Sequence, residues 1–266
     1  MTCGRNAIVS YETIKLKEVF DGQVIELTLN SPPSNILTAA MMGEISLFMR
    51  QQRINEKLKL IIFKGEGENF SFGASVDEHT AERVKNMLPG FHQMIGEILE
   101  HPVPSLAQVA GLCLGGGFEL ALACSFIVAD EKAKFSVPEI QLGVFPPVAA
   151  ALLPHLANNS VAARMLLTGT RLGALELKEA GLVALIADGN DLHATVESFV
   201  EKNFLPLSSS SLRFAQRACR MSVVQQYQGL IEDLESLYLD ELMKTHDANE
   251  GIQSFIEKRS PVWTNN

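Results

Sequence analysis

The chain has 266 residues, of which 47% are hydrophobic and 20% are charged, a composition typical of an ordinary globular protein with a sizeable core. The net charge is −9, from 22 basic and 31 acidic residues, and no cluster of Lys and Arg could track a phosphate backbone, so nucleic-acid binding is not expected. No run of about 18 apolar residues could span a membrane, and the first twenty residues do not resemble a secretory signal. We therefore expect a soluble, cytoplasmic protein.

The cysteines do not indicate a metal site or a disulfide framework. The four of them lie far apart without a C-x-x-C pair, and three are in apolar surroundings typical of small core residues. Their positions are Cys3, Cys113, Cys124 and Cys219. No metal site is expected.

Hydrophobic patterning predicts two strands near the start of the chain and a helix between them. Strands are predicted at Val24–Leu29 and Leu58–Phe63, each followed by turn-forming residues. The segment Thr38–Arg53 has apolar residues at helical spacing, and Thr38 is a suitable N-cap. The result is a strand–helix–strand unit.

The same alternation continues along the chain. Further helices are predicted at about 81–99 and 116–124, and further strands at 105–109, 126–129, 133–136 and 183–186. This pattern predicts an α/β core with largely parallel strands, although spacing alone does not separate an open sheet from a barrel or a spiral.

After Leu207 the strand signals cease. Three helices are predicted at about 208–221, 223–243 and 247–258. Their apolar residues, including Leu230, Leu234, Leu237 and Leu242, need a surface to cover them, either the chain's own core or a neighbouring subunit. We therefore divide the chain into a core, residues 1–207, and a helical oligomerisation region, residues 208–266.

One glycine-rich segment could hold a negatively charged oxygen. In Ala110-Gly-Leu-Cys-Leu-Gly-Gly-Gly-Phe-Glu119-Leu, a strand ends in three glycines and an apolar helix begins. The glycines allow close approach of a ligand to backbone N–H groups at a helix start. Glu119 lies on the first turn of that helix, where enclosure would raise its pKa. A tight turn with a carboxylate that only complements the helix dipole is the alternative.

Two other segments contain suitable partners for this site. Glu139 follows a predicted strand in an apolar segment, and a second enclosed carboxylate would provide the pair of acid–base groups that hydration of a double bond needs. Two unrelated surface glutamates are the alternative. Ala74, after the glycine turn at Gly73, could offer a second backbone donor to a thioester oxygen.

Ser75 and His79 offer a competing interpretation of the same region. They are four residues apart and could be the nucleophile and base of a hydrolase. However, the chain has no G-x-S-x-G elbow, and the other histidines form no recognisable constellation.

Taken together, Phe70-Ser-Phe-Gly-Ala74, the glycine segment ending at Glu119-Leu, and Pro138-Glu139-Ile-Gln-Leu-Gly143 resemble the enoyl-CoA hydratase/isomerase, or crotonase, family in order and spacing. The resemblance runs from about Val24 to the C-terminal segment ending at Arg259. It implies a spiral of β-β-α turns, a C-terminal helical region that mediates trimer contacts, and commonly a hexamer of two trimers.

The resemblance also implies roles for individual residues. The N–H groups of Ala74 and Gly116 would form the oxyanion hole, and Glu119 and Glu139 would hold the water, as in the family's hydratases. The expected partner is an acyl-CoA thioester, and no separate cofactor is implied because CoA is part of the substrate. Lys258 and Arg259 are candidates for phosphate contacts, with a solvated helix face as the alternative.

The chain departs from the common family pattern at the expected substrate pocket. Ser75 stands where straight-chain hydratases usually have Asp, and Phe145-Pro146-Pro147 replaces a glycine-rich wall. These strings look closest to the family's cyclic dienoyl-CoA hydratases of anaerobic aromatic degradation, and a rigid apolar wall suits a planar ring. The alternatives are a general short-chain enoyl-CoA hydratase, a thioester hydrolase and a non-catalytic binding protein with the same fold.

Overall fold

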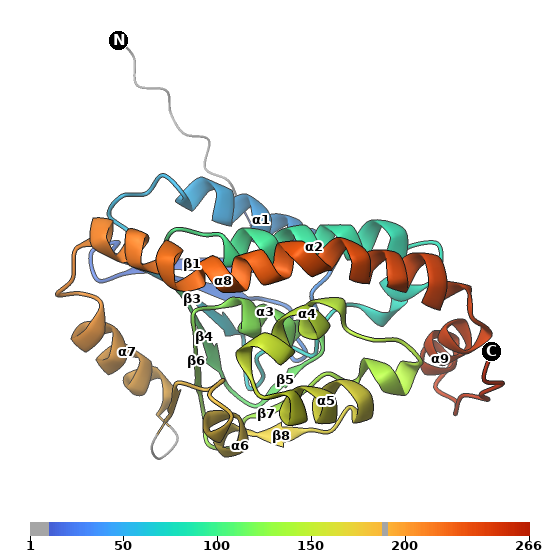
Figure 1. Ribbon diagram of the computed structural model, residues 1–266. Coiled ribbons are helices and arrows are strands. Elements are labelled where there is room, and N and C mark those ends of the chain that lie inside the picture. Colours follow the sequence, from blue (N-terminus) through green and yellow to red (C-terminus); the bar gives the residue numbers. More distant parts are fainter. Residues whose placement is uncertain (1–10, 188–190) are drawn as a thin grey trace, which may run out of the picture.

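A six-stranded sheet forms the centre of the computed structural model, which describes residues 11–187 and 191–266 (Figure 1). Its strands lie in the order β1-β2-β3-β4-β6-β9. The strands are β1 (Ile14–Val19), β2 (Val24–Leu29), β3 (Leu60–Gly65), β4 (Ser105–Val109), β6 (Phe126–Ala129) and β9 (Leu185–Ile186). β1 is antiparallel to β2, and the other neighbours are parallel, so the predicted α/β class is confirmed.

A second, smaller sheet explains how the chain winds. It contains β5 (Leu112–Leu114), β7 (Lys134–Ser136) and β8 (Leu172–Gly173). The chain places β4 in the large sheet and β5 in the small one, forms helix α3 (Gly116–Ala123), and then repeats this order with β6 and β7. Ser71 joins the small sheet through a single bridge to Cys113 of β5, and Leu37 forms a similar single bridge with Ala74. This repetition is the β-β-α spiral that the family resemblance implies.

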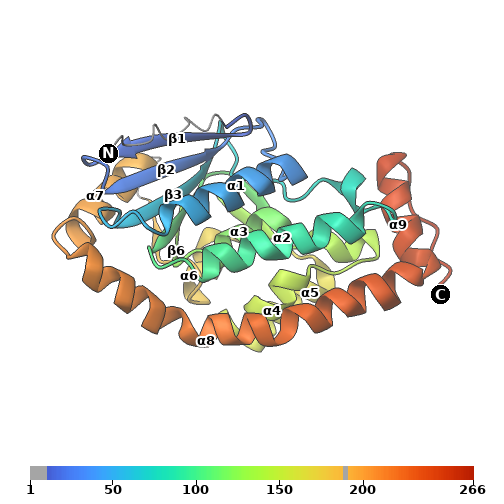
Figure 2. The ribbon, with the colours of Figure 1, turned by 90° about the horizontal axis from the view of Figure 1, so that it is seen from above.

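The helices cover the spiral on several sides. They are α1 (Ala39–Gln52), α2 (Val84–Leu99), α4 (Pro147–Leu156), α5 (Asn159–Thr168), α6 (Ala174–Glu179), α7 (Leu192–Asn203), α8 (Ser209–Ser236) and α9 (His246–Ile256). The Thr38 hydroxyl caps α1 by accepting from the Met41 N–H, as its position before the apolar pattern predicts. Viewed from above, α8 runs beside α2 and α4 (Figure 2).

The C-terminal helices differ from the prediction in one respect. The break predicted between residues 221 and 223 is wrong, because α8 continues through Ser222 to Ser236, a stretch with no proline to interrupt the backbone hydrogen bonds. A π-helical turn, Leu237–Glu241, and a 3₁₀ turn, Leu242–Lys244, then lead to α9. Leu230, Leu234 and Leu242 pack against the core of the same chain, whereas Leu237 is 43% exposed.

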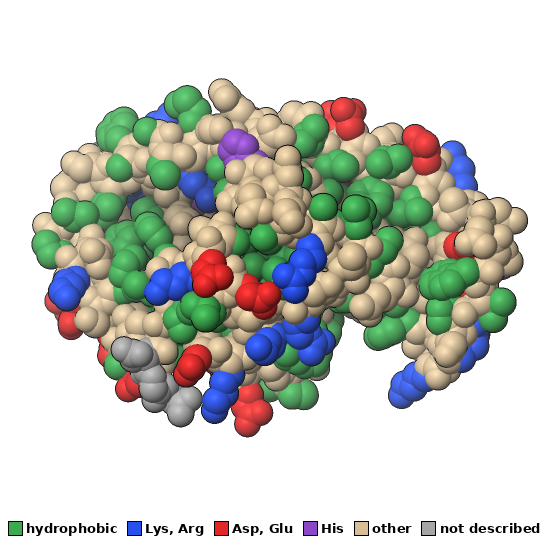
Figure 3. All heavy atoms as spheres, turned by 60° about the horizontal axis from the view of Figure 1, so that its bottom comes forward, with side chains coloured by type: hydrophobic (Ala, Val, Ile, Leu, Met, Phe, Trp, Pro, Cys, Tyr) green, Lys and Arg blue, Asp and Glu red, His purple; other side chains and the backbone are tan. Residues whose placement is uncertain are grey.

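Charged side chains of both signs lie on the surface (Figure 3), and two of the cysteines are buried. Within the described ranges, no helix has both the length and the apolar character needed to cross a membrane. On the face shown in Figure 3, basic and acidic side chains are interspersed. Cys113 and Cys124 are buried and Cys219 is exposed, while Cys3 lies outside the described residues.

Candidate active site

The glycine-rich segment brings two carboxyl-bearing elements close together. Gly115 has a φ of +50°, a conformation that residues with a side chain rarely adopt, and a Cβ built on it would lie 2.6 Å from Oε1 of Glu139. Only glycine therefore fits between β5 and α3 with Glu139 in this position. Glu119 lies on the first turn of α3, which is buried along its whole length.

Two backbone N–H groups meet on the same side of this segment. Gly73 has a φ of +99°, and a Cβ built on it would lie 2.9 Å from the Gly116 nitrogen. A Cβ built on Gly116 would in turn lie 3.1 Å from the Ala74 nitrogen. As the first residue of α3, Gly116 precedes the first intrahelical hydrogen bond. Ala74 and Gly116 line the same pocket, so this arrangement can hold an oxyanion.

Glu119 is held by the start of another helix. Its side chain is buried, and its Oε1 accepts a hydrogen bond from the Ala149 N–H at 2.8 Å. Burial raises the pKa of Glu119 from 4.5 to about 7, although N–H groups of Ala149 and Val148 oppose the rise. These donors belong to the first turn of α4, which begins at Pro147. The segment containing Pro146 and Pro147 therefore also orients the first carboxyl.

The Glu139 carboxyl has fewer hydrogen-bond partners than the Glu119 carboxyl among the described residues. It lies in a 3₁₀ turn, Pro138–Leu142, and its Oε2 is buried with no hydrogen-bond partner among the described residues. Burial, and then the nearby charge of Glu119, raise the pKa of Glu139 to about 8. Two interacting carboxyls of this kind titrate as a pair. Near neutral pH the pair holds a proton and can both accept and donate one.

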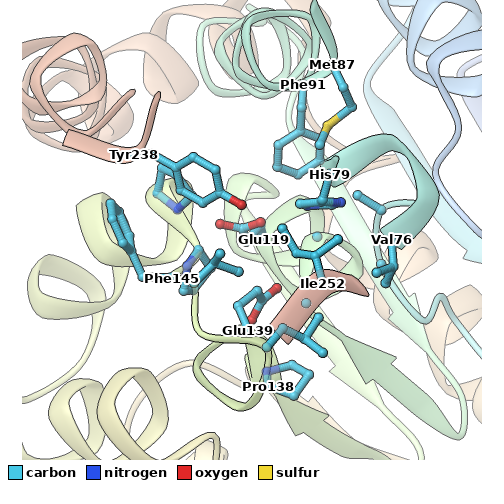
Figure 4. Close-up of a pocket in the computed structure, with 18 of the residues that line it drawn as sticks. Val76, His79, Met87, Phe91, Glu119, Pro138, Glu139, Phe145, Tyr238 and Ile252 are labelled. Carbon is cyan, nitrogen blue, oxygen red and sulfur yellow. The ribbon is translucent and has the colours of Figure 1, made fainter. Parts of the chain in front are cut away.

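The rest of the pocket is mainly apolar, as Figure 4 shows. Phe145, Pro146 and Pro147 line it, as expected from the sequence. The other apolar wall residues come from the segment around Gly73, from α2, from the end of the 3₁₀ turn that contains Glu139 and the residues after it, and from α9. They include Phe72, Val76, Met87, Phe91, Leu142, Val144 and Ile252. Ser75 does not line this pocket. It lies in a neighbouring groove that shares Ala74 and Leu142 with the pocket.

The Ser75–His79 pair does not have the geometry of a nucleophile and its base. Nδ1 of His79 lies 2.8 Å from the backbone carbonyl oxygen of Ser75, not from its hydroxyl. Because a carbonyl only accepts, this contact places a proton on Nδ1. Burial also lowers the pKa of His79 and favours the neutral ring. His79 itself lines the pocket.

Tyr238 is a pocket residue that the sequence did not indicate. It comes from the π-helical turn after α8, about 100 residues beyond Glu139 in the chain. The predicted helix in this region had only an apolar pattern, and nothing local to Tyr238 distinguishes it from other core aromatics.

The proposed phosphate contacts are not brought together at the pocket. Arg259 lines the neighbouring groove but is paired with Glu250, at 2.5 and 2.8 Å, and with Glu257, at 2.5 Å. These carboxylates offset the charge that a phosphate would meet at Arg259. Lys258 is exposed beside it.

Comparisons with known proteins agree with this geometry. The sequence profile described as enoyl-CoA hydratase/isomerase matches residues 20–266. The chain is 40% identical over 245 residues to a cyclohexa-1,5-dienecarbonyl-CoA hydratase of Thauera aromatica, covering 92% of this chain and 94% of the relative. It is 33% identical over 253 residues to a carnitinyl-CoA dehydratase of Salmonella typhi, covering 91% and 95%.

Solved structures show the same architecture. A crystal structure of an enoyl-CoA hydratase from Mycobacterium avium subsp. paratuberculosis matches with a TM-score of 0.85 at 25% identity, covering 96% of this chain and 100% of that one. An enoyl-CoA hydratase/isomerase from Xanthobacter autotrophicus matches with a TM-score of 0.82 at 26% identity, covering 94% and 98%.

These matches define a crotonase-fold enzyme of the hydro-lyase type. The chain belongs to the enoyl-CoA hydratase/isomerase family, and the expected resemblance to its dienoyl-CoA hydratases is confirmed.

Proposed function

We propose that this protein adds water reversibly to an α,β-unsaturated acyl-CoA thioester whose acyl group is a cyclic diene. The observation that carries this proposal is the approach of Glu139 to Gly115, which places a carboxyl pair beside two converging N–H groups. The 40%-identical relative is named for such a dienecarbonyl-CoA substrate. Aromatic-compound degradation in the cytoplasm is the corresponding cellular setting.

The reaction follows from the placement of these groups. The thioester oxygen accepts hydrogen bonds from the N–H groups of Ala74 and Gly116, which stabilise the enolate that forms when water adds to the conjugated system. Glu119 and Glu139 hold the water, and one of them accepts its proton as the C–O bond forms. Protonation of the enolate carbon from the carboxyl pair completes the addition, and the reverse sequence removes water.

The pocket wall supports a cyclic acyl group. Phe145 packs edge-on against Tyr238, with ring centroids 5.5 Å apart, and Pro147 starts α4. Prolines and packed aromatic rings have few conformations, so they form a stiff apolar surface that suits a planar ring. The CoA arm would reach the carboxyl pair through the groove that contains Ser75, because that groove and the pocket share Ala74 and Leu142.

Subunit assembly is part of this proposal. Within the described surface, α8 exposes Phe214 at 69% and Met221 at 59%, and large apolar side chains in such positions favour protein contacts. The helical region from residue 208 would then mediate a homotrimer or a hexamer. Size-exclusion chromatography with light scattering tests this, and a monomer at micromolar concentration would contradict it.

The proposed activity is tested by incubating the protein in parallel with cyclohexa-1,5-diene-1-carboxyl-CoA and with crotonyl-CoA. Mass spectrometry follows the loss of substrate and the gain of one water. We expect the cyclic thioester to be hydrated much faster. Preference for crotonyl-CoA would instead indicate a general short-chain hydratase, free CoA thiol would indicate a hydrolase, and no change with retained thioester binding would indicate a binding protein.

A further inference from the structure

Tyr238 occupies an unusual position in the backbone. It lies in the π-helical turn Leu237–Glu241 that interrupts the helical run between α8 and α9. Such turns are rare and often occur at functional sites. The Tyr238 side chain lines the pocket, and only 1% of the residue's surface is exposed.

The hydroxyl of Tyr238 has no hydrogen-bond partner in the part of the chain that the structure describes. Its oxygen is buried and forms no hydrogen bond among the described residues, although an unmade hydrogen bond of a buried group is costly. Tyr227, which is similarly buried, donates to the His92 carbonyl oxygen at 2.7 Å. The contrast indicates that the Tyr238 hydroxyl is directed at a group that the protein itself does not supply.

Tyr238 and the carboxyl pair line the same pocket. Figure 4 shows the hydroxyl directed toward Glu119, with Glu139 on the opposite side of the pocket. Burial, and then the charges of Glu139 and Glu119, raise the pKa of Tyr238. Tyr238 therefore remains protonated at neutral pH and can donate a hydrogen bond.

We propose that the Tyr238 hydroxyl donates a hydrogen bond to the oxygen atom that is added to the substrate, first as water and then as the hydroxyl of the product. This inference rests on the proposed hydratase function. A water molecule directs its two O–H groups toward carboxyl oxygens and retains two lone pairs. One lone pair accepts from Tyr238, and the other is left to attack the carbon.

This role makes Tyr238 a catalytic residue supplied by the C-terminal part of the chain. In the dehydration direction, the same hydrogen bond stabilises the departing oxygen. Ligands that carry the added hydroxyl should benefit from Tyr238, and otherwise identical ligands without it should not.

The test compares matched ligand pairs by isothermal titration calorimetry. One pair is 2-hydroxycyclohexane-1-carboxyl-CoA and cyclohexane-1-carboxyl-CoA, and the other is 3-hydroxybutyryl-CoA and butyryl-CoA. For Tyr238→Phe we expect about ten-fold weaker binding of the hydroxylated member, which is the size of one hydrogen bond, and unchanged binding of the other member.

Tyr227→Phe is the control, since it removes the hydroxyl of an equally buried tyrosine outside the pocket. It should lower Tm, because a hydrogen bond to His92 is lost, without changing the preference for either ligand of a pair. Tyr238→Phe should keep the wild-type Tm. Equal effects of Tyr238→Phe on both members of each pair would overturn the inference while leaving the hydratase proposal intact. Failure of the wild-type protein to bind any of the four thioesters would instead contradict the proposed function, and the inference with it.

Discussion

Replacement of Glu139 by Gln separates catalysis from substrate binding. Gln has nearly the same shape as Glu but cannot accept and return a proton. We expect kcat to fall by about 10²–10⁴-fold, the usual contribution of one acid–base group, which corresponds to about 2.7–5.5 kcal/mol of activation free energy. Affinity for acyl-CoA thioesters should change little, because the N–H groups of Ala74 and Gly116 that would bind the thioester oxygen are retained.

The same substitution should also stabilise the protein at neutral pH. Burial and the charge of Glu119 raise the pKa of Glu139 from 4.5 to about 8. Between these values the folded chain binds more protons than the unfolded chain, so the free energy of unfolding decreases as pH rises through this window. At pH 7 the resulting decrease in the free energy of unfolding has an upper limit of about 3 kcal/mol. Contact between the carboxyl and water in the pocket would make the decrease smaller. Glu139→Gln removes this loss.

Three measurements check the prediction. Substrate consumption gives kcat, calorimetry gives thioester affinity, and urea unfolding at pH 5 and pH 7.5 gives the change in stability. The exposed Glu131, on the turn between β6 and β7, provides the control variant Glu131→Gln, which should match the wild type throughout. An unchanged kcat in Glu139→Gln would refute the catalytic role of this carboxyl.

The remaining predictions concern the oxyanion site, the pH response and the wall. Gly73→Ala should lower kcat by about 10²-fold or more, because the new Cβ would lie 2.9 Å from the Gly116 nitrogen at a φ of +99°. Gly90→Ala, on an open face of α2, is the matched control. Equal kcat values for the two variants would contradict the assignment of the oxyanion site to this segment. A pH–rate profile of kcat/KM should show apparent pKa values near 7 and 8 from the carboxyl pair, and a flat profile from pH 6 to 9 would refute the assignment. Phe145→Ala should lower the rate with the cyclic dienoyl-CoA relative to the rate with crotonyl-CoA, measured in a mixed-substrate assay. An unchanged ratio of the two rates would show that Phe145 does not determine substrate specificity.

The elements with a strong local signal could be predicted from the sequence. β2, β4 and β6 have the predicted bounds, since short apolar runs between turn residues have few other structures to adopt. β1 gave no such signal, because it is an edge strand whose middle residues are exposed and mostly charged, with Lys15, Lys17 and Glu18 among them.

The motifs likewise indicated the carboxyl pair and the backbone donors, because glycines at a strand end and an acidic residue on a helix start are visible in a single stretch of sequence. In the folded chain, the pairing of β5 with β7 then brings Glu139 close to Gly115. The sequence alone could predict that enclosure raises the pKa of Glu119. It could not predict that the charge of Glu119 also raises the pKa of Glu139, because this effect depends on how close the two carboxyls lie in the folded chain.

The tertiary structure decided which distant residues complete the pocket. Ser75 follows Ala74 directly but faces a different groove, since the direction of a side chain depends on the backbone at that residue. Tyr238 and the α4 donors to Glu119 reach the pocket from other helices. Their positions depend on helix packing and on a π-helical turn, which result from contacts across the whole core and leave no local pattern in the sequence.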